Sequence, residues 1–294
     1  MEILFKGIDV SKWQGAIDWK KVKQAGVQFA MLRDGFGRYE GQADEYFEQN
    51  YKAATEAGIH VGAYHFSYAK TVEQARAEAA YCKKLIAGKT FSFPIAYDVE
   101  DSAQASLSKA EVSAIVDAFC SEMEAAGYYV CVYMNLSWLN SKLTDDIFKK
   151  YDIWLAHWTD RTSFARSYGM WQYTSDGAVD GISGRVDLDY AYKNYPNIMR
   201  QNGLNGYPRE SDPASGGAAA GAAFPARRMV TLENTPLYVS STAKTPAARK
   251  TGTFYIYDGK RLNGRYRITN AVDRCGKKPV SENVTGYVDE SDLR

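Results

Sequence analysis

Short apolar runs alternate with amphipathic segments over the first two thirds of the chain. Runs rich in apolar, β-branched and aromatic residues predict eight strands, at Gly7–Val10, Phe29–Arg33, Val61–Phe66, Ile95–Glu100, Tyr129–Asn135, Ile153–His157, Met170–Tyr173 and Val186–Asp189. Apolar residues three and four positions apart predict helices at Asp44–Ala57, Val72–Ile86 and Lys109–Ala126. Helical patterns become sparse after the fifth strand.

This order of elements predicts a barrel. Strands that alternate with helices run parallel and carry the helices on their outer face, and eight such strands can close into a barrel. Because the late strands are joined by short or irregular links, we expect an irregular (β/α) barrel with an incomplete helical ring. In such barrels the chemistry gathers where the strands end.

The pattern changes after residue 200. Residues 201–226 are rich in Gly, Ala, Ser and Pro without periodicity, which predicts a flexible linker. Residues 227–294 return to short alternating strands separated by turn residues, which predicts a small all-β barrel. A chain of 294 residues thus divides into a large domain at 1–200 and a small one at 227–294.

The net charge of +1 conceals an uneven distribution of charge. Residues 226–294 carry 13 Lys and Arg against 7 Asp and Glu, whereas the rest of the chain carries 23 against 28. A basic small domain suggests attraction to an anionic surface, although charge scattered for solubility explains the numbers equally well. No apolar run approaches the roughly 20 residues of a membrane-spanning helix, so we expect no membrane insertion.

Several kinds of chemistry lack a signal in the sequence. The histidines His65 and His157 are far apart and have no third ligand at zinc-like spacing. No serine or cysteine stands in a nucleophile motif, and there is no phosphate loop. We expect no metal, no cofactor and no nucleic-acid partner. The cysteines are interpreted as reduced packing residues: Cys82, Cys120, Cys131 and Cys275.

Acidic residues at the strand ends give the first positive signal. Asp98 and Glu100 lie two positions apart in FPIAYDVED, so both face the same side of a strand, about 6.5 to 7 Å apart. Asp9 and Asp187 lie on strands one and eight, which become neighbours when the barrel closes. Taken singly, each acid could be a helix cap or a surface charge. Together they predict a site in which crowding keeps one carboxyl protonated beside an ionised partner, as glycosidic cleavage requires.

The acids next to these four, Asp101 and Asp189, we interpret as exposed or structural. Aromatic residues near the strand ends give a second signal, because a sugar ring packs its apolar face on an aromatic ring while hydroxyls bond to polar edges. Packing in the core is the alternative interpretation for each of them: Trp13, Tyr64, Tyr97, Trp154, Trp158, Trp171 and Tyr173.

Residues 7–192 resemble the family 25 glycoside hydrolases, the Chalaropsis-type lysozymes. The resemblance rests on a series of motifs in the same order, namely GIDVSKWQG, FAMLRDG, VGAYHF, FPIAYDVED, VYMN, IWLAHW, MWQYTS and GRVDLDYAY. It implies an irregular eight-stranded barrel that hydrolyses the β-1,4 bond between N-acetylmuramic acid and N-acetylglucosamine with net retention.

The same resemblance implies roles for individual residues. Glu100 is the general acid and then the base. Asp98 stabilises either an oxazolinium formed by the substrate's acetamido group or a glycosyl-enzyme, while Asp9 and Asp187 shape the site. The substrate-binding residues implied by the match and by the aromatic pattern are Tyr64, Tyr97, Asn135, Trp158, Trp171 and Gln172.

The last domain resembles the bacterial Src-homology-3-like modules of clostridial endolysins and autolysins, through TPLYVSS, GRYRITN and VTGYVDESDL. Wall anchoring is the implied role, with self-association through this domain left open. A row of tyrosines forms either a peptide-binding groove or ordinary packing: Tyr238, Tyr255, Tyr257, Tyr266 and Tyr287.

Two other functions remain as alternatives. A chitinase-like hydrolase would also carry acids on strand four, but the DxxDxDxE spacing is missing. A non-catalytic glycan-binding protein would share the aromatic rim, yet it does not need a protonated acid beside an ionised one. The N-terminal MEILFKGIDVS lacks the features of a secretory signal. We therefore expect a phage or prophage endolysin, made in the host cytoplasm and released to the wall through a holin, with a host autolysin as the alternative.

Overall fold

The computed structural model describes residues 2–208, 224, 226–277 and 280–293. They belong to two compact units, Met1–Arg209 and Glu210–Arg294, which are described in turn. Within the described residues no helix is long and apolar enough to span a membrane.

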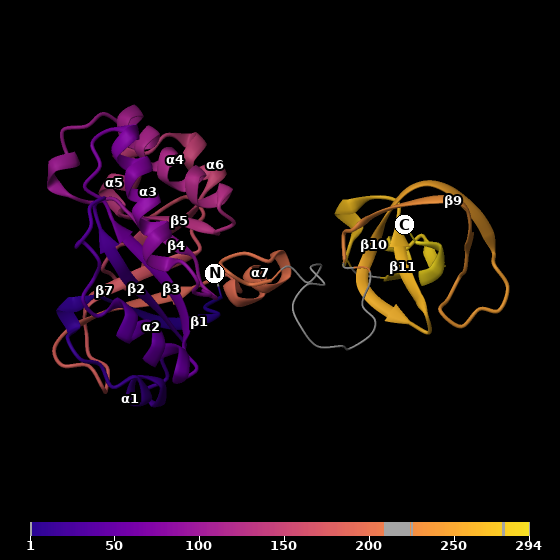
Figure 1. Cartoon of the computed structure of the whole chain (residues 1–294), viewed down its shortest axis with the longest axis horizontal. Coiled ribbons are helices and arrows are strands. Elements are labelled where there is room, and N and C mark those ends of the chain that lie inside the picture. Colours follow the sequence, from indigo (N-terminus) through magenta and orange to yellow (C-terminus); the bar gives the residue numbers. More distant parts are fainter. Residues whose placement is uncertain (1, 209–223, 225, 278–279, 294) are drawn as a thin grey trace. The chain divides into compact units, whose positions relative to one another are not determined.

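The first unit is a closed barrel of eight strands in sequential order, as the sequence predicts (Figure 1). The strands are β1 (Phe5–Val10), β2 (Phe29–Phe36), β3 (His60–Phe66), β4 (Ile95–Asp98), β5 (Val130–Asn135), β6 (Asp152–Ala156), β7 (Met170–Gly177) and β8 (Val186–Ala191). Strands β1 to β7 run parallel, but β8 is antiparallel to both β7 and β1. The expectation of parallel strands throughout is wrong for β8, because its link from β7 contains no helix and short links join antiparallel strands.

Helices cover the barrel only in part, which confirms the expected incomplete ring. They are α1 (Trp19–Gln24), α2 (Phe47–Glu56), α3 (Val72–Ile86), α4 (Lys109–Ala125), α5 (Leu136–Lys142), α6 (Asp145–Lys150) and α7 (Tyr195–Asn202), with 3-10 turns η1 (Lys12–Gln14) and η2 (Ser102–Gln104). No helix joins β6 to β7 or β7 to β8, two links that lie wholly within the described residues. Local capping fixes where the long helices start: Thr71 caps α3, and Ser108 caps α4 in a reciprocal bond with Glu111.

Side chains alternate between the two faces of each barrel strand. One set packs inside the barrel, including Phe29, Met31 and Trp154, and the other packs between strands and helices, including Ile8 and Leu32. Since the interior is filled below the carboxyl ends of the strands, the open space that remains lies at that end of the barrel.

The barrel unit continues past the predicted boundary at residue 200. Asn205 is fully buried; its Nδ2 donates to the Phe93 carbonyl (2.8 Å) and its Oδ1 accepts from the Tyr129 amide (2.7 Å). A linker that starts at residue 201 is therefore wrong, because a polar side chain with these buried partners fastens this segment to the barrel. Of the predicted linker, residues 209–223 and 225 lie outside the described residues.

The second unit is a small antiparallel sheet, in line with the predicted all-β fold. Its four strands, in the order β12-β11-β10-β9, form a half-barrel. The elements are β9 (Met229–Leu237), β10 (Ala248–Leu262), β11 (Arg265–Thr269), η3 (Val272–Arg274), α8 (Val280–Asn283), β12 (Gly286–Asp289) and η4 (Glu290–Asp292). An isolated bridge between Tyr238 and Tyr287 brings the end of β9 to β12. Of the five tyrosines noted in the sequence, Tyr257 and Tyr266 are buried packing residues.

All four cysteines are free and buried, which confirms their interpretation as packing residues.

Candidate active site

A cleft of about 370 Å³ opens at the carboxyl end of the barrel and contains all four predicted acids. Its lining residues are Asp9, Val10, Ser11, Trp13, Gln14, Arg33, Tyr64, Phe66, Asp98, Glu100, Tyr133, Trp154, Trp158, Gln172, Ser175 and Asp187. Three strands therefore bring together carboxyl groups that are far apart in the sequence.

Strand register explains why these acids meet. Asp9 on β1 pairs directly with Asp187 on the antiparallel β8, so the first residues of β8 lie beside the last residues of β1. Asp98 is the final residue of β4, and Glu100 follows two positions later. Because side chains alternate along a strand, Asp98 faces the barrel interior, and the chain carries Glu100 onward to the opening of the cleft.

Gln172 links the acids to the aromatic wall of the cleft. It is buried on β7, and its Nε2 donates to Asp9 Oδ2 (2.8 Å). Its Oε1 accepts from the Tyr133 hydroxyl and from Trp158 Nε1, each at 3.0 Å. One amide therefore holds a carboxylate, a phenol and an indole in fixed positions.

A fifth carboxyl, Asp189, lies beneath Asp9. Asp189 is fully buried, so the expectation that it is exposed is wrong and the structural interpretation remains. Trp154 Nε1 donates to its Oδ1 (2.7 Å), whereas its Oδ2 accepts from no donor among the described residues. Burial raises the pKa of Asp189 to about 8. The pKa of Asp9 is raised well above its usual range. Burial is the main cause, followed by the charges of Asp189 and Asp187 and by a hydrogen bond with Asp189.

A hydrogen bond between the carboxyls of Asp9 and Asp189 requires a proton on one of them. The raised pKa values of both therefore favour protons on this pair at a pH where isolated aspartates are ionised. The other acid whose role was in doubt, Asp101, is structural: its side chain caps the 3-10 turn η2.

Asp98 and Glu100 differ in how far they are withdrawn from water. Asp98 is buried, and its Oδ1 has no hydrogen-bond partner among the described residues. Burial and the Glu100 charge raise the pKa of Asp98, opposed by Arg33. Glu100 remains exposed at the cleft opening, where partial desolvation and then the charges of Asp187 and Asp101 raise its pKa. The site thus places an exposed carboxyl above a buried one, and the pKa of each is raised.

Among the described residues, Arg33 is the one Lys or Arg that lines the cleft, and it already forms an ion pair. Its Nη2 and Nε lie 2.7 Å and 2.8 Å from Asp44 Oδ2. Because Asp44 neutralises much of this positive charge, Arg33 stabilises the ionised form of the cleft acids only weakly. Their affinity for protons therefore stays high.

The other predicted substrate-binding residues divide into two groups. Tyr64, Trp158 and Gln172 line the cleft. Asn135 lines an adjoining cavity of about 460 Å³ that shares Glu100, Tyr133 and Trp158 with the cleft, and its side chain also caps α5 by accepting from the Trp138 amide.

Tyr97 and Trp171 do not reach the cleft, and this corrects their prediction as substrate-binding residues. Tyr97 is fully buried on the helix-facing side of β4, stacked on Phe119 with ring centroids 3.8 Å apart. Trp171 is buried in the same outer layer, where its Nε1 donates to the His157 carbonyl (2.8 Å). Strand alternation is the reason: each residue adjoins one that faces inward, Asp98 or Gln172, and so must face outward.

Several lining residues escaped prediction, among them Arg33, Phe66 and Tyr133. The signal that could have found them is the same alternation. Tyr133 lies two positions before Asn135, and Arg33 lies two after the interior residue Met31. Counting in twos along each strand identifies the inward face once a single inward residue is known.

One group of metal-ligand types occurs among the described residues, outside the cleft lining. The donor atoms of Asp34, His65 and Cys82 lie within 4.8 Å of one another, all buried. His65 uses both ring nitrogens in hydrogen bonds, Nδ1 with Asp34 Oδ1 (2.8 Å) and Nε2 with the Gly37 carbonyl (2.7 Å). Burial alone would lower the pKa of His65, but Asp34 outweighs it and raises that pKa. The group therefore functions as a buried hydrogen-bonded pair with a thiol beside it.

An eight-stranded barrel with clustered carboxyls at the carboxyl ends of its strands is an architecture in which glycosidic bonds are cut. The chain belongs to the glycosyl hydrolases family 25, whose sequence profile matches residues 8–182. It is 32% identical over 197 residues to lysozyme M1 of Streptomyces globisporus, with 62% of this chain and 66% of the relative covered. It is 30% identical over 185 residues to the autolytic lysozyme of Clostridium acetobutylicum, with 63% and 55% covered.

Among solved structures, the chain is similar to the modular autolysin LytC from Streptococcus pneumoniae in complex with a synthetic peptidoglycan ligand. The TM-score is 0.58 at 31% identity, and the match covers 64% of this chain and 46% of the autolysin. The chain thus spans between about half and two thirds of the length of these relatives.

Proposed function

We propose that this chain is a peptidoglycan hydrolase that cleaves the β-1,4 bond between N-acetylmuramic acid and N-acetylglucosamine with net retention. The observation that carries the proposal is the cleft of acids with raised pKa values and few partners. Membership of family 25 and the similarity to named lysozymes support the same function.

Glu100 is the proposed general acid. Its raised pKa increases the share of the carboxyl that holds a proton as the pH approaches neutrality, and its exposure lets that proton return from water after each turnover. Glu100 transfers the proton to the glycosidic oxygen as the bond between that oxygen and the anomeric carbon of the muramic acid breaks. The sugar released from the reducing side then leaves as an alcohol.

Asp98 is the proposed partner of the positive charge that develops on the sugar. Its carboxylate either stabilises an oxazolinium formed by the acetamido oxygen or bonds to the anomeric carbon itself. In both cases Glu100, now a carboxylate, takes a proton from a water molecule as the water attacks the same carbon. Two successive inversions at the anomeric carbon give net retention.

Asp9, Asp187 and Asp189 have an electrostatic role in this proposal. The charge of Asp187 raises the proton affinity of Glu100, and the raised pKa values of Asp9 and Asp189 limit the negative charge beneath the site. Gln172 holds Asp9 in place (2.8 Å). Asp187 of β8 thus helps to set the protonation state of Glu100, which follows β4.

The test is an analysis of the reducing ends produced from purified peptidoglycan. Borohydride reduction of the digest should convert muramic acid to muramitol and leave glucosamine intact. Reduced glucosamine would contradict the proposal and indicate a glucosaminidase or chitinase-like specificity. Release of no new reducing end from walls of any candidate host would indicate a glycan-binding protein.

A matched pair of variants assigns the chemistry to the cleft. Glu100→Gln should lower kcat by about 10² to 10⁴, the usual contribution of a general acid. Asp101→Asn changes the next residue along the chain to another good cap of the turn η2 and removes only the smaller of the two charges that raise the pKa of Glu100, so it should keep most of the activity. Equal losses in the two variants would contradict the role of Glu100.

We also propose that the second unit anchors the chain to the cell wall. The support is the excess of 13 basic over 7 acidic residues in 226–294, since walls carry anionic polymers. The Glu100→Gln chain should sediment with walls and be released by salt as the Debye length shortens. Binding that is unchanged by salt would contradict an electrostatic anchor, and light scattering of the same sample reports self-association.

The proposed cellular role follows from the substrate. Peptidoglycan lies outside the cell membrane, so the chain must reach the wall to act, and we propose release from the host cytoplasm through a phage holin. Co-expression with and without a holin tests this: lysis that needs the holin supports it, and lysis without one favours a host autolysin exported by another route.

A further inference from the structure

Exposed aromatic residues are confined to one end of the barrel unit. Within its described residues, the exposed large hydrophobic side chains are Ile3, Leu4 and four aromatics: Trp13 (77% exposed), Tyr39 (60%), Tyr68 (43%) and Trp158 (62%). Each aromatic follows the carboxyl end of a parallel strand, respectively β1, β2, β3 and β6. Trp13 and Trp158 line the cleft, whereas Tyr39 and Tyr68 lie beyond its lining.

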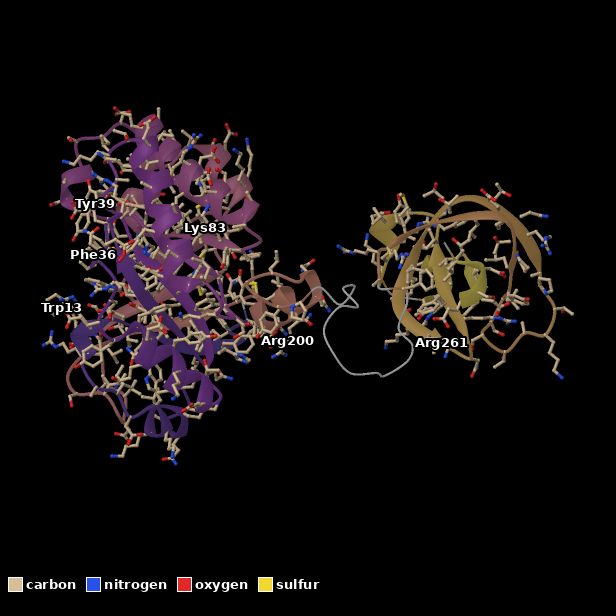
Figure 2. All side chains as sticks on the ribbon, in the orientation of Figure 1. Trp13, Phe36, Tyr39, Lys83, Arg200 and Arg261 are labelled. Carbon is tan, nitrogen blue, oxygen red and sulfur yellow. The ribbon has the colours of Figure 1, made fainter. Side chains whose placement is uncertain are left out.

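Tyr39 and Tyr68 are connected to the cleft through further rings. Phe66 lines the cleft, its ring centroid lies 5.2 Å from that of Tyr68, and Tyr68 lies 6.0 Å from Phe36. The Gly37 amide donates to the Phe66 carbonyl (3.0 Å), which joins the loop that carries Tyr39 to the end of β3. Figure 2 shows Trp13, Phe36 and Tyr39 along the same edge of the barrel unit. We name Phe36, Tyr39, Phe66 and Tyr68 the aromatic ledge.

Polar side chains hold the two loops of the ledge in place. Glu78 is fully buried, and its Oε1 accepts from the Tyr68 amide (2.9 Å) while its Oε2 accepts from the Tyr97 hydroxyl (2.6 Å). Gln42 Oε1 accepts from the amides of Tyr39 (2.7 Å) and Arg38 (2.9 Å). The exposed rings therefore stand on a fixed backbone, so binding a ligand would require little ordering of the loops.

The charges beside the rings indicate what kind of ligand fits. The Arg38 guanidinium lies 4.7 Å from the centre of the Tyr39 ring, and Lys12 Nζ lies 5.4 Å from that of Trp13. Aromatic rings accept the apolar face of a sugar, and the Arg38 guanidinium complements a carboxylate, whereas Lys12 already pairs with Glu45 (3.0 Å). A glycan strand that carries lactyl and peptide carboxylates offers both groups at regular intervals.

We propose that the aromatic ledge binds the glycan strand of peptidoglycan beyond the sugars held in the cleft. This inference rests on the proposed function, and it adds a site that selects long strands over short fragments. The strand runs from the cleft across Phe66 and Tyr68 towards Tyr39, with its carboxylates near Arg38.

The test compares two substrates: long peptide-bearing glycan strands and a tetrasaccharide fragment purified from them. The double variant Tyr39→Ala/Tyr68→Ala should lower the ratio of kcat/KM on long strands to kcat/KM on the tetrasaccharide by roughly tenfold, from the loss of two ring contacts. The conservative variant Tyr39→Phe/Tyr68→Phe keeps both rings and should keep the ratio within about twofold of that of the native chain.

Leu4→Ala is the matched control, since Leu4 is 40% exposed but precedes β1 at the opposite end of the strands. If the ratio is unchanged in the alanine double variant, the aromatic ledge does not bind the glycan strand, whether both rates fall together or neither falls. The proposed function would still stand in that case. Failure of the native chain to release muramic acid reducing ends from either substrate would overturn the proposed function itself.

Discussion

The barrel unit contains two groups of acids, and they differ in their hydrogen-bond partners. The partnered acids are Glu78 and Asp152: Glu78 accepts from the Tyr68 amide and the Tyr97 hydroxyl, and Asp152 accepts from two tyrosine hydroxyls and pairs with Lys193. The cleft acids are Asp9, Asp98, Glu100, Asp187 and Asp189. One oxygen of Asp98 and one of Asp189 accept no hydrogen bond from the described residues.

The difference shows that burial alone does not identify a functional acid. A buried carboxylate whose oxygens all accept hydrogen bonds is stable as an anion and fixes the structure around it. A buried carboxyl that lacks donors retains a proton instead, and its neighbours then decide when that proton leaves. Substitutions in the two groups of acids should therefore have opposite effects on activity and stability.

Asp98→Asn should lower kcat by about 10² to 10³, since an amide cannot balance the positive charge on the sugar. The same change should raise the thermal midpoint, because it removes a buried carboxyl with an unpaired oxygen. Kinetics on soluble glycan strands and calorimetry measure the two effects. A variant that loses activity and stability together would place Asp98 among the partnered acids.

Glu78→Ala should show the opposite pattern. It leaves the Tyr68 amide and the Tyr97 hydroxyl without their acceptors, which should cost about 2 to 4 kcal/mol of unfolding free energy. Urea unfolding measures this loss. Cleavage of the tetrasaccharide, which needs only the cleft, should stay within about tenfold of the native rate; a loss as large as that of Asp98→Asn would end the distinction between the groups.

Asp189→Asn should alter the pH dependence of stability. In the native chain the pKa of Asp189 is raised to about 8, against about 3.9 in an unfolded chain. The folded state therefore holds an extra proton between these values, so native stability falls as the pH rises through that window. The amide introduced by this substitution still accepts from Trp154 and can donate to Asp9, and it has no proton to lose.

The expected result is a gain in stability that grows with pH and levels off above about pH 8, where it exceeds about 1.4 kcal/mol, the equivalent of one pKa unit. Urea unfolding at a series of pH values measures it. The other titratable groups near Asp189 are Asp9, Asp187 and Tyr173. Tyr64 lies near Asp9 and Arg33. A pH-independent difference would show that the pKa of Asp189 is not raised in the folded chain.

The smallest effects should come from a pair of tyrosines on the two faces of the sheet. Tyr133→Phe removes the hydroxyl that bonds to Gln172 (3.0 Å) in the cleft, and it should lower kcat/KM by roughly tenfold, the equivalent of about 1.4 kcal/mol. Tyr97→Phe removes the hydroxyl bonded to Glu78 and should cost about 1 kcal/mol of stability. A loss of stability alone in Tyr133→Phe and a loss of activity alone in Tyr97→Phe would contradict the inward orientation of Tyr133 and the outward orientation of Tyr97.

The sequence predicted the position of all eight barrel strands, because the apolar patterns record which segments are buried. It could not predict the direction of β8, since such a pattern is the same when read in either direction. The prediction that Tyr97 and Trp171 bind substrate is wrong for a different reason. Both lie near a strand end, but side chains alternate along a strand, so each faces away from its neighbour Asp98 or Gln172. Alternation alone would have corrected both.

Other features depend on tertiary contacts that no local sequence pattern predicts. The burial of Asp189 depends on Trp154, 35 positions earlier in the chain. Likewise Asn205 looks like a linker residue until its bonds to Phe93 and Tyr129 are known. The composition of residues 201–208 resembles that of the segment that follows, so only tertiary contacts mark the end of the barrel unit.

The most direct test of the account is the ionisation of Glu100 itself. Carbon-13 NMR of the carboxyl carbons of labelled glutamates, with Glu100→Gln to assign the signal, measures its pKa in the free protein. We predict a value above the ordinary glutamic acid pKa of about 4.3, and a shift towards that value in Asp187→Asn, because the Asp187 charge helps to raise it. A Glu100 that titrates at or below the ordinary value, unaffected by Asp187→Asn, would contradict the central claim that the cleft acids hold a proton ready for transfer.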